Sequence, residues 1–90
     1  MPTQFLWDTR PGRNMDHVVA HGMTTAIWEA VFHRAARSAP DKDDETITIA
    51  EGRHGRQWYR IIYAEQGDGT VVPLSILPIT GFPIERRALR

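Results

Sequence analysis

Three side chains with cationic or titratable groups, Arg53, His54 and Arg56, fall within four consecutive residues of a glycine-rich stretch. Guanidinium groups bind phosphate, and an imidazole can transfer a proton near neutral pH. RNA cleavage without a metal needs a group that deprotonates the attacking 2′-hydroxyl, a group that protonates the leaving 5′-oxygen, and cations that stabilise the phosphorane. The cluster is therefore a candidate phosphate site, and the alternative is a solvated turn.

Two tyrosines are further candidates. Tyr59 and Tyr63 are four residues apart, so in a strand they share one face, while Arg60 shares the other face with Trp58 and Ile62. A buried tyrosine needs only a hydrogen-bond partner, whereas an accessible one can stack on a base. We expect one tyrosine in the core and the other at the site, and Tyr63 is the candidate for the site.

His17 and His21 are also four residues apart and would share one face of a helix. This spacing suits a metal, a nuclease site, or the packing of a helix end. No third ligand is evident, and the acidic residues at 41, 43, 44 and 45 are typical of a solvated loop. We therefore predict no metal and no cofactor.

Two helices are expected before any long strand. Asn14 can cap a helix over about residues 15–21, which Gly22 would end. Thr24 can cap a second helix whose apolar face includes Trp28 and Phe32. Alanines at 35 and 36 favour its continuation, and Pro40 ends it at the latest.

After residue 44, polar and apolar residues alternate with a period of two, which is typical of half-buried strands. Strands are predicted at residues 46–49, 58–64 and 70–77, with turns at 52–56 and 66–69, and residues 4–7 can form an edge strand. Pro73 places the last strand at an edge or at a bulge. The fold class is α+β, with two N-terminal helices packed on one face of an antiparallel sheet.

Composition and charge limit the class of protein. Ninety residues make one domain, 1–90, and the absence of cysteine excludes disulfides and thiol chemistry. No segment is long and apolar enough to span a membrane and no secretory signal is evident, so we expect a cytoplasmic protein. Residues 53–90 hold six arginines against three acidic residues, which is compatible with RNA or an acidic protein as partner.

The ordered set of motifs resembles the BrnT family of toxins over nearly the whole chain. The matching segments are Phe5-x-Trp7-Asp8, Asn14-x-x-His17-x-x-x-His21-Gly22, Gly52-Arg53, Gly55-Arg56, Ile61-Ile62-Tyr63, Thr70-Val71-Val72-Pro73 and Glu85-Arg86-Arg87. The resemblance implies a RelE-like fold and the endoribonuclease toxin of a type II toxin-antitoxin system. It also implies a small ribbon-helix-helix antitoxin as partner, in a toxin-antitoxin heterotetramer.

On this resemblance and the chemistry above, the predicted catalytic residues are Arg53, His54, Arg56, Tyr63 and Arg86. Arg60 and Arg87 are predicted to bind RNA, and His17 and His21 are further candidates. The family usually has an arginine where this chain has residues 77–79 (Leu-Pro-Ile). A catalytically inactive or stand-alone module that binds a protein partner or nucleic acid is therefore the alternative.

Overall fold

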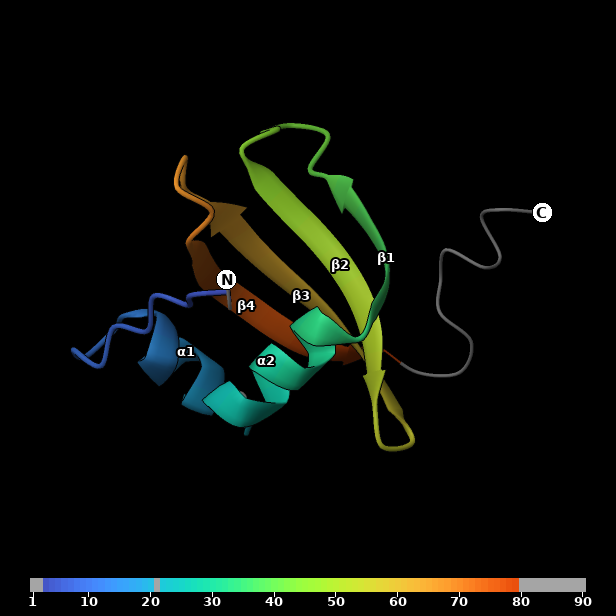
Figure 1. Ribbon diagram of the computed structural model, residues 1–90. Helices are drawn as coiled ribbons and strands as arrows, with labels where there is room; N and C mark the ends of the chain where they lie inside the picture. Colours follow the sequence, from blue (N-terminus) through green and yellow to red (C-terminus); the bar gives the residue numbers. More distant parts are fainter. Residues whose placement is uncertain (1–2, 21, 80–90) are drawn as a thin grey trace.

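Two short helices precede the sheet in the computed structural model, which describes residues 3–20 and 22–79. They are α1 (Asn14–Ala20) and α2 (Thr25–His33) (Figure 1). Thr24 caps α2 as predicted, because its Oγ1 accepts a 3.1 Å hydrogen bond from the Ile27 N–H. Arg34 is the C-cap of α2, and its N–H donates back to the Ala30 carbonyl.

The four strands form one antiparallel sheet in the order of the chain. They are β1 (Ala35–Pro40), β2 (Ile47–His54), β3 (Gln57–Glu65) and β4 (Val71–Ile79). Each strand pairs with its neighbour in sequence (Figure 1). The prediction of an α+β protein with two helices and an antiparallel sheet is therefore confirmed at this level.

The first strand corrects the prediction for residues 35–40. Ala35 and Ala36 were expected to extend the second helix, but α2 stops at His33 and the alanines begin β1. Every residue of β1 is exposed, so no apolar alternation marks it as a strand. It forms because the chain reverses after Pro40 and pairs with β2, and this tertiary pairing overrides the helix propensity of alanine.

The last strand contains the irregularity that Pro73 predicted. The register between β3 and β4 shifts between Ile62 and Tyr63, where Ser75 and Pro73 are the successive partners. Leu74 is thus the extra residue of a bulge. Residues 4–7 do not form a full strand, but Phe5 makes an isolated parallel bridge to Val71.

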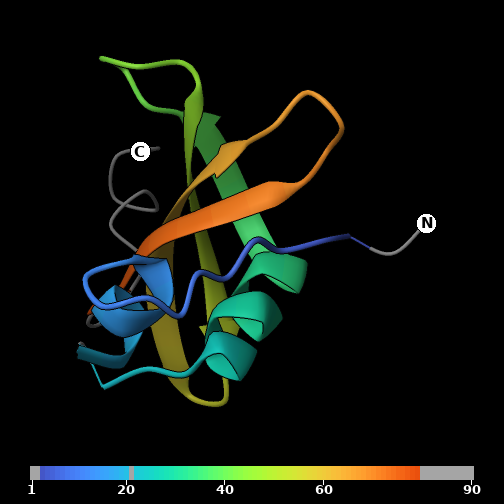
Figure 2. The ribbon, with the colours of Figure 1, turned by 90° about the vertical axis from the view of Figure 1, so that its left-hand side faces the viewer.

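The core lies between the helices and one face of the sheet (Figure 2). Trp28 and Val31 of α2 and Val18 of α1 are fully buried. They pack in one cluster with residues that alternate along the strands, namely Ala50, Tyr59, Ile61, Tyr63 and Ile76. We call the opposite face, which α1 and α2 do not cover, the outer face; Glu51, Arg53, Trp58 and Arg60 lie on it by strand alternation.

Gly52 sets how closely α2 approaches the sheet. A Cβ at this position would lie 2.8 Å from the Val31 carbonyl oxygen and 3.1 Å from the Ala35 Cα. Both atoms belong to the backbone, so a side chain could not be accommodated by a rotamer change. The junction between α2 and β1, which contains Arg34, therefore lies directly over β2 only because residue 52 is glycine.

Replacing Gly52 by alanine is expected to lower the free energy of unfolding by about 1–3 kcal/mol, the usual cost of overpacking. Gly67 is a matched control, because a Cβ there meets no atom within 4 Å and its backbone is not left-handed. Urea denaturation of both variants measures the difference. Equal stability of the two variants would contradict the close approach described for Gly52.

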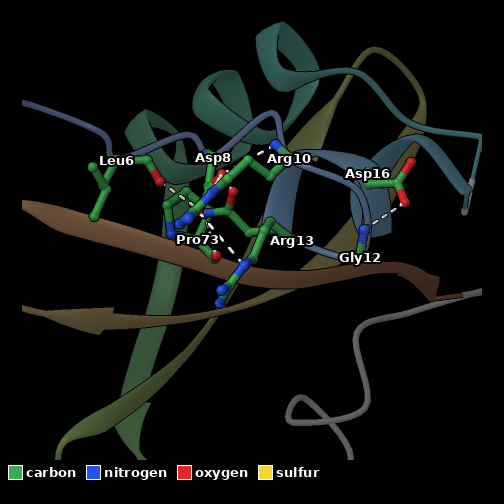
Figure 3. Close-up of polar contacts among 8 residues, drawn as sticks. Leu6, Asp8, Arg10, Gly12, Arg13, Asp16 and Pro73 are labelled. Atoms are coloured by element: carbon green, nitrogen blue, oxygen red, sulfur yellow. Dashed lines mark hydrogen bonds and ion pairs between the residues drawn. The ribbon is translucent and has the colours of Figure 1, made fainter.

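The N-terminal segment is attached to β4 by the backbone hydrogen bonds of the Phe5–Val71 bridge and by the side chain of Asn14, which reaches Leu6 and Pro73 (Figure 3). Asn14 Nδ2 donates to the carbonyl oxygens of Leu6 and Pro73, at 2.7 and 3.0 Å, and its Oδ1 accepts from the Asp8 N–H at 2.7 Å. All three bonds involve backbone groups, so the side chain replaces a strand partner along this edge of the sheet. Asn14 thus has a structural role.

Candidate functional site

A cleft of about 510 Å³ opens at the end of the sheet near the turn between β2 and β3. It is lined by Arg34, Arg53 and Trp58, and we call it the arginine cleft. Arg53 and Trp58 are cross-strand partners on the outer face, while Arg34 comes from the C-cap of α2. The cleft therefore depends on the approach of α2 that Gly52 allows.

Arg56 lies next to this cleft in a two-residue turn. The predicted turn over residues 52–56 is shorter in the structure, because β2 continues to His54 and β3 starts at Gln57. Gly55 adopts a φ of 65°, which suits the first central residue of a tight hairpin. Arg56 follows it and is exposed at the tip of the hairpin.

The arginines of this end of the molecule have no carboxylate partner within the described part of the chain. Neither an ion pair nor a side-chain hydrogen bond joins Arg34, Arg53 or Arg56 to another described residue. Arg10, in contrast, is tied to Asp8, and Arg60 to Glu51. Uncompensated guanidinium groups on two sides of a cleft are suited to bind a multivalent anion.

His54 is separated from Arg53 by the pleat of β2. Successive side chains of a strand point to opposite faces, so His54 shares the helix-covered face with Gly52 whereas Arg53 lies on the outer face. The His54 Nδ1 is buried and has no hydrogen-bond partner among the described residues. Buried polar atoms are normally paired, so such an atom is a candidate for a functional group.

Both tyrosines lie in the core, which corrects the expectation that one of them is accessible. Tyr59 is 9% exposed and Tyr63 is 8% exposed. Tyr63 makes edge-on ring contacts with Trp28 and Phe32, and burial, together with the charge of Glu65, raises the pKa of its hydroxyl. A raised pKa keeps the phenol protonated, so Tyr63 is a poor proton acceptor.

Tyr63 is also distant from the arginine cleft. It lies five residues after Trp58 along β3, and its cross-strand partners are Thr48 and Pro73. Five residues of extended chain span roughly 17 Å. The structure therefore does not bring Tyr63 together with Arg53, and its catalytic role stays a prediction.

Arg60 holds a buried carboxylate on the outer face. Its Nε and Nη2 both donate to Glu51 Oε2, at 2.8 and 2.6 Å, and the side chain of Glu51 is only 8% exposed. Arg37 of β1 is the other cross-strand neighbour of Glu51. Because Arg60 uses two of its hydrogen-bond donors in this pair, it has fewer donors left for RNA than Arg53 has.

A second cleft, of about 390 Å³, lies between the N-terminal segment, α1 and β4. It includes His17 and Arg13, but also Asp8, whose carboxylate pairs with Arg10 at 2.6 Å and approaches Arg13 at 3.9 Å (Figure 3). The hydrogen bonds from Arg10 lower the pKa of Asp8 to about 2. The two arginines therefore share one carboxylate here, unlike those of the arginine cleft, which have none among the described residues.

Three predicted site residues, His21, Arg86 and Arg87, lie outside the described residues. Within residues 3–20 and 22–79, no group of three or more His, Cys, Asp or Glu side chains is placed to hold a metal ion. No helix in the same ranges is long and apolar enough to span a membrane.

Two residues of the arginine cleft were missed by sequence reasoning. Arg34 was not singled out, and Trp58 was noted only as a neighbour of Arg60 on one strand face. A signal for Trp58 was present, because strand alternation puts it opposite Arg53 once the turn is reduced to two residues. No local signal connects Arg34 with Arg53, which are 19 residues apart in sequence.

Comparison with known proteins gives no relative: no protein-family model, curated protein or solved structure matches the chain.

Proposed function

We propose that this protein is an endoribonuclease toxin of the BrnT type, on a RelE-like architecture, that binds RNA at the arginine cleft and cleaves it without a metal. The single observation that carries the proposal is the set of three guanidinium groups, Arg34, Arg53 and Arg56, with no described carboxylate partner. A surface that leaves three arginines uncompensated in a molecule of zero formal charge favours an external anion.

RNA supplies that anion in a form that matches arginine. A guanidinium donates two parallel hydrogen bonds to a phosphate, and this geometry also suits the negative charge that builds up on the phosphorane during cleavage. Arg53 and Arg34 would bind successive phosphates from two sides of the cleft, and Arg56 would extend the contact at the hairpin tip. Binding of phosphate by these arginines is needed both for RNA cleavage and for RNA binding without cleavage.

His54 is the residue proposed to move protons. Attack of the 2′-oxygen on phosphorus transfers the hydroxyl proton to a base and displaces the 5′-oxygen, which takes up a proton, leaving a 2′,3′-cyclic phosphate. An imidazole can perform either transfer near neutral pH. His54 follows Arg53 in the chain but lies on the helix-covered face, so this role requires the RNA to reach the imidazole around the end of the sheet. Its Nδ1 has no competing partner among the described residues.

A second candidate function is RNA binding without cleavage. The observation that favours it is the position of Tyr63, which is buried and roughly 17 Å along β3 from Trp58. Of the predicted catalytic residues that are described, Arg53, His54 and Arg56 alone are close in the chain. A site with cations but without a second proton-transfer group would hold RNA and leave it intact.

The deciding experiment is incubation of purified protein with end-labelled RNA in the presence of EDTA. We expect products that end in a 2′,3′-cyclic phosphate, and a loss of about 100-fold or more in rate for His54→Ala, as for removal of a general acid or base. Glu45→Ala, at an exposed position of the loop between β1 and β2, is the control. Intact RNA that is nevertheless bound would establish the second candidate.

The partner and cellular context are part of the same proposal. A small ribbon-helix-helix antitoxin would neutralise the toxin in a heterotetramer in the cytoplasm by covering the arginine cleft. Acidic side chains opposite Arg34 and Arg53 would then increase the association rate and make it sensitive to salt. The supporting observation is the same uncompensated charge that favours RNA.

A further inference from the structure

Trp58 differs from the other two tryptophans in its environment. Trp28 is fully buried, and Trp7 donates from Nε1 to Glu29 at 2.7 Å and packs edge-on against Trp28. Trp58 is half-buried on the outer face and makes no ring contact with another aromatic side chain among the described residues. Its indole therefore retains a surface that residues 3–20 and 22–79 do not cover.

The position of that indole is specific. Trp58 forms one wall of the arginine cleft, whose other walls are Arg34 and Arg53. A flat aromatic surface beside two guanidinium groups matches the two parts of a nucleotide, since a base stacks on the indole while phosphates pair with arginine. The cleft, of about 510 Å³, is open and lined by these three residues, so a nucleotide would lie on its surface and would not be enclosed.

We propose that Trp58 is a base-stacking residue, so that the arginine cleft takes an unpaired nucleotide and selects single-stranded RNA over duplex. This inference rests on the proposed function, because it assumes that the anion in the cleft is RNA. A base in a duplex is already stacked on both sides and cannot lie on Trp58, whereas its phosphates remain accessible to arginine. The arginines thus bind single-stranded and duplex RNA alike, and Trp58 makes the single strand bind more tightly.

The test compares three variants by fluorescence anisotropy with labelled RNA. The probe is a 2′-fluoro RNA, which lacks the attacking hydroxyl and cannot be cleaved; it is used as a single strand, as a duplex with its complement, and as an abasic strand. The variants are Trp58→Leu, Trp58→Phe and the control Ile62→Ala, which lies four residues further along the same face of β3 but outside the cleft. Thermal denaturation verifies that each variant folds.

We expect Trp58→Leu to weaken binding of the single strand by about 5- to 150-fold, the range for loss of one stacked base. Binding of the duplex and of the abasic strand should change little, Trp58→Phe should retain most of the affinity, and Ile62→Ala should behave as the unaltered protein does. Together these results would establish the stacking role.

Other outcomes overturn the inference in distinguishable ways. If Trp58→Leu leaves single-strand affinity unchanged while Arg53→Ala lowers it, stacking is wrong and the proposed function stands. If Trp58→Leu weakens duplex and single strand equally, the residue has only a structural effect. If the unaltered protein binds none of the probes, the proposed function itself fails, and the half-buried indole of Trp58 is then a surface for an acidic protein partner.

Discussion

Replacing Arg34 and Arg53 together by alanine is expected to weaken RNA binding about 100-fold at moderate salt. A hydrogen bond to a charged group contributes roughly 1.5 kcal/mol or more, so two such contacts give about this factor. The salt dependence changes as well, because each phosphate contact with a single strand contributes about 0.7 to the slope of log K against log salt. The slope should decrease by about 1.4, which titrations at several salt concentrations measure.

The control for this experiment is the pair Arg10→Ala and Arg13→Ala, which removes the same charge from another part of the surface. These arginines are 70% and 58% exposed, and both lie near Asp8. Because both lie beside the carboxylate of Asp8 and outside the arginine cleft, their loss should have little effect on RNA affinity or on the salt slope. An equal loss in both double variants would mean that RNA responds to net charge and that the arginine cleft has no special role.

The second large effect concerns stability. Glu51→Ala should lower the free energy of unfolding by about 3 kcal/mol, because it leaves the guanidinium of Arg60, which is 29% exposed, without its carboxylate. This loss of stability is near the lower end of the range for a broken buried ion pair, because Arg60 remains partly hydrated. Urea denaturation at constant pH measures it.

A double variant shows whether the lost stability comes from leaving Arg60 without its carboxylate or from lost packing. Glu51→Leu combined with Arg60→Leu removes both charges and fills the same surface with apolar groups, so it should recover most of the stability that Glu51→Ala loses. If the double variant is as unstable as Glu51→Ala, the effect comes from packing on the outer face and the ion pair is not its cause. The single variants Glu51→Leu and Arg60→Leu complete a double-mutant cycle.

Most of the fold could be predicted because its signals are local. The Thr24 cap and the apolar spacing around Trp28 identify α2, and the alternation from Ile47 onward identifies β2. Pro73 correctly indicated an irregular strand, because a residue without an N–H interrupts a ladder. In each case one or two neighbouring residues determine the structure.

The parts that could not be predicted depend on contacts distant in sequence. Nothing in the sequence of residues 35–40 distinguishes β1 from a helix end, since its side chains are exposed and its pairing with β2 is the cause of its conformation. Arg34 was therefore not recognised as a site residue. Its place beside Arg53 results from the packing of α2 on Gly52, which periodicity cannot show.

The structure arranges the predicted cluster of Arg53, His54 and Arg56 differently from the sequence-based expectation. A turn over residues 52–56 would have placed Arg53, His54 and Arg56 together, whereas the longer β2 places Arg53 and His54 on opposite faces. The extension of β2 through the predicted turn to His54 is therefore enough to divide a cluster. The same extension brings Trp58 opposite Arg53, which creates the arginine cleft.

The order of the strands also has a consequence for how the chain folds. Because β1 to β4 are neighbours both in sequence and in the sheet, each pairing closes a short loop and has a small entropic cost. The bridge from Phe5 to Val71 instead joins two segments that are distant in the chain. The sheet should therefore form first, and the N-terminal segment, which Asn14 also ties to β4, should attach last and open first. The end of the sheet that bears Arg53 is then already built while the opposite edge of the molecule is still open.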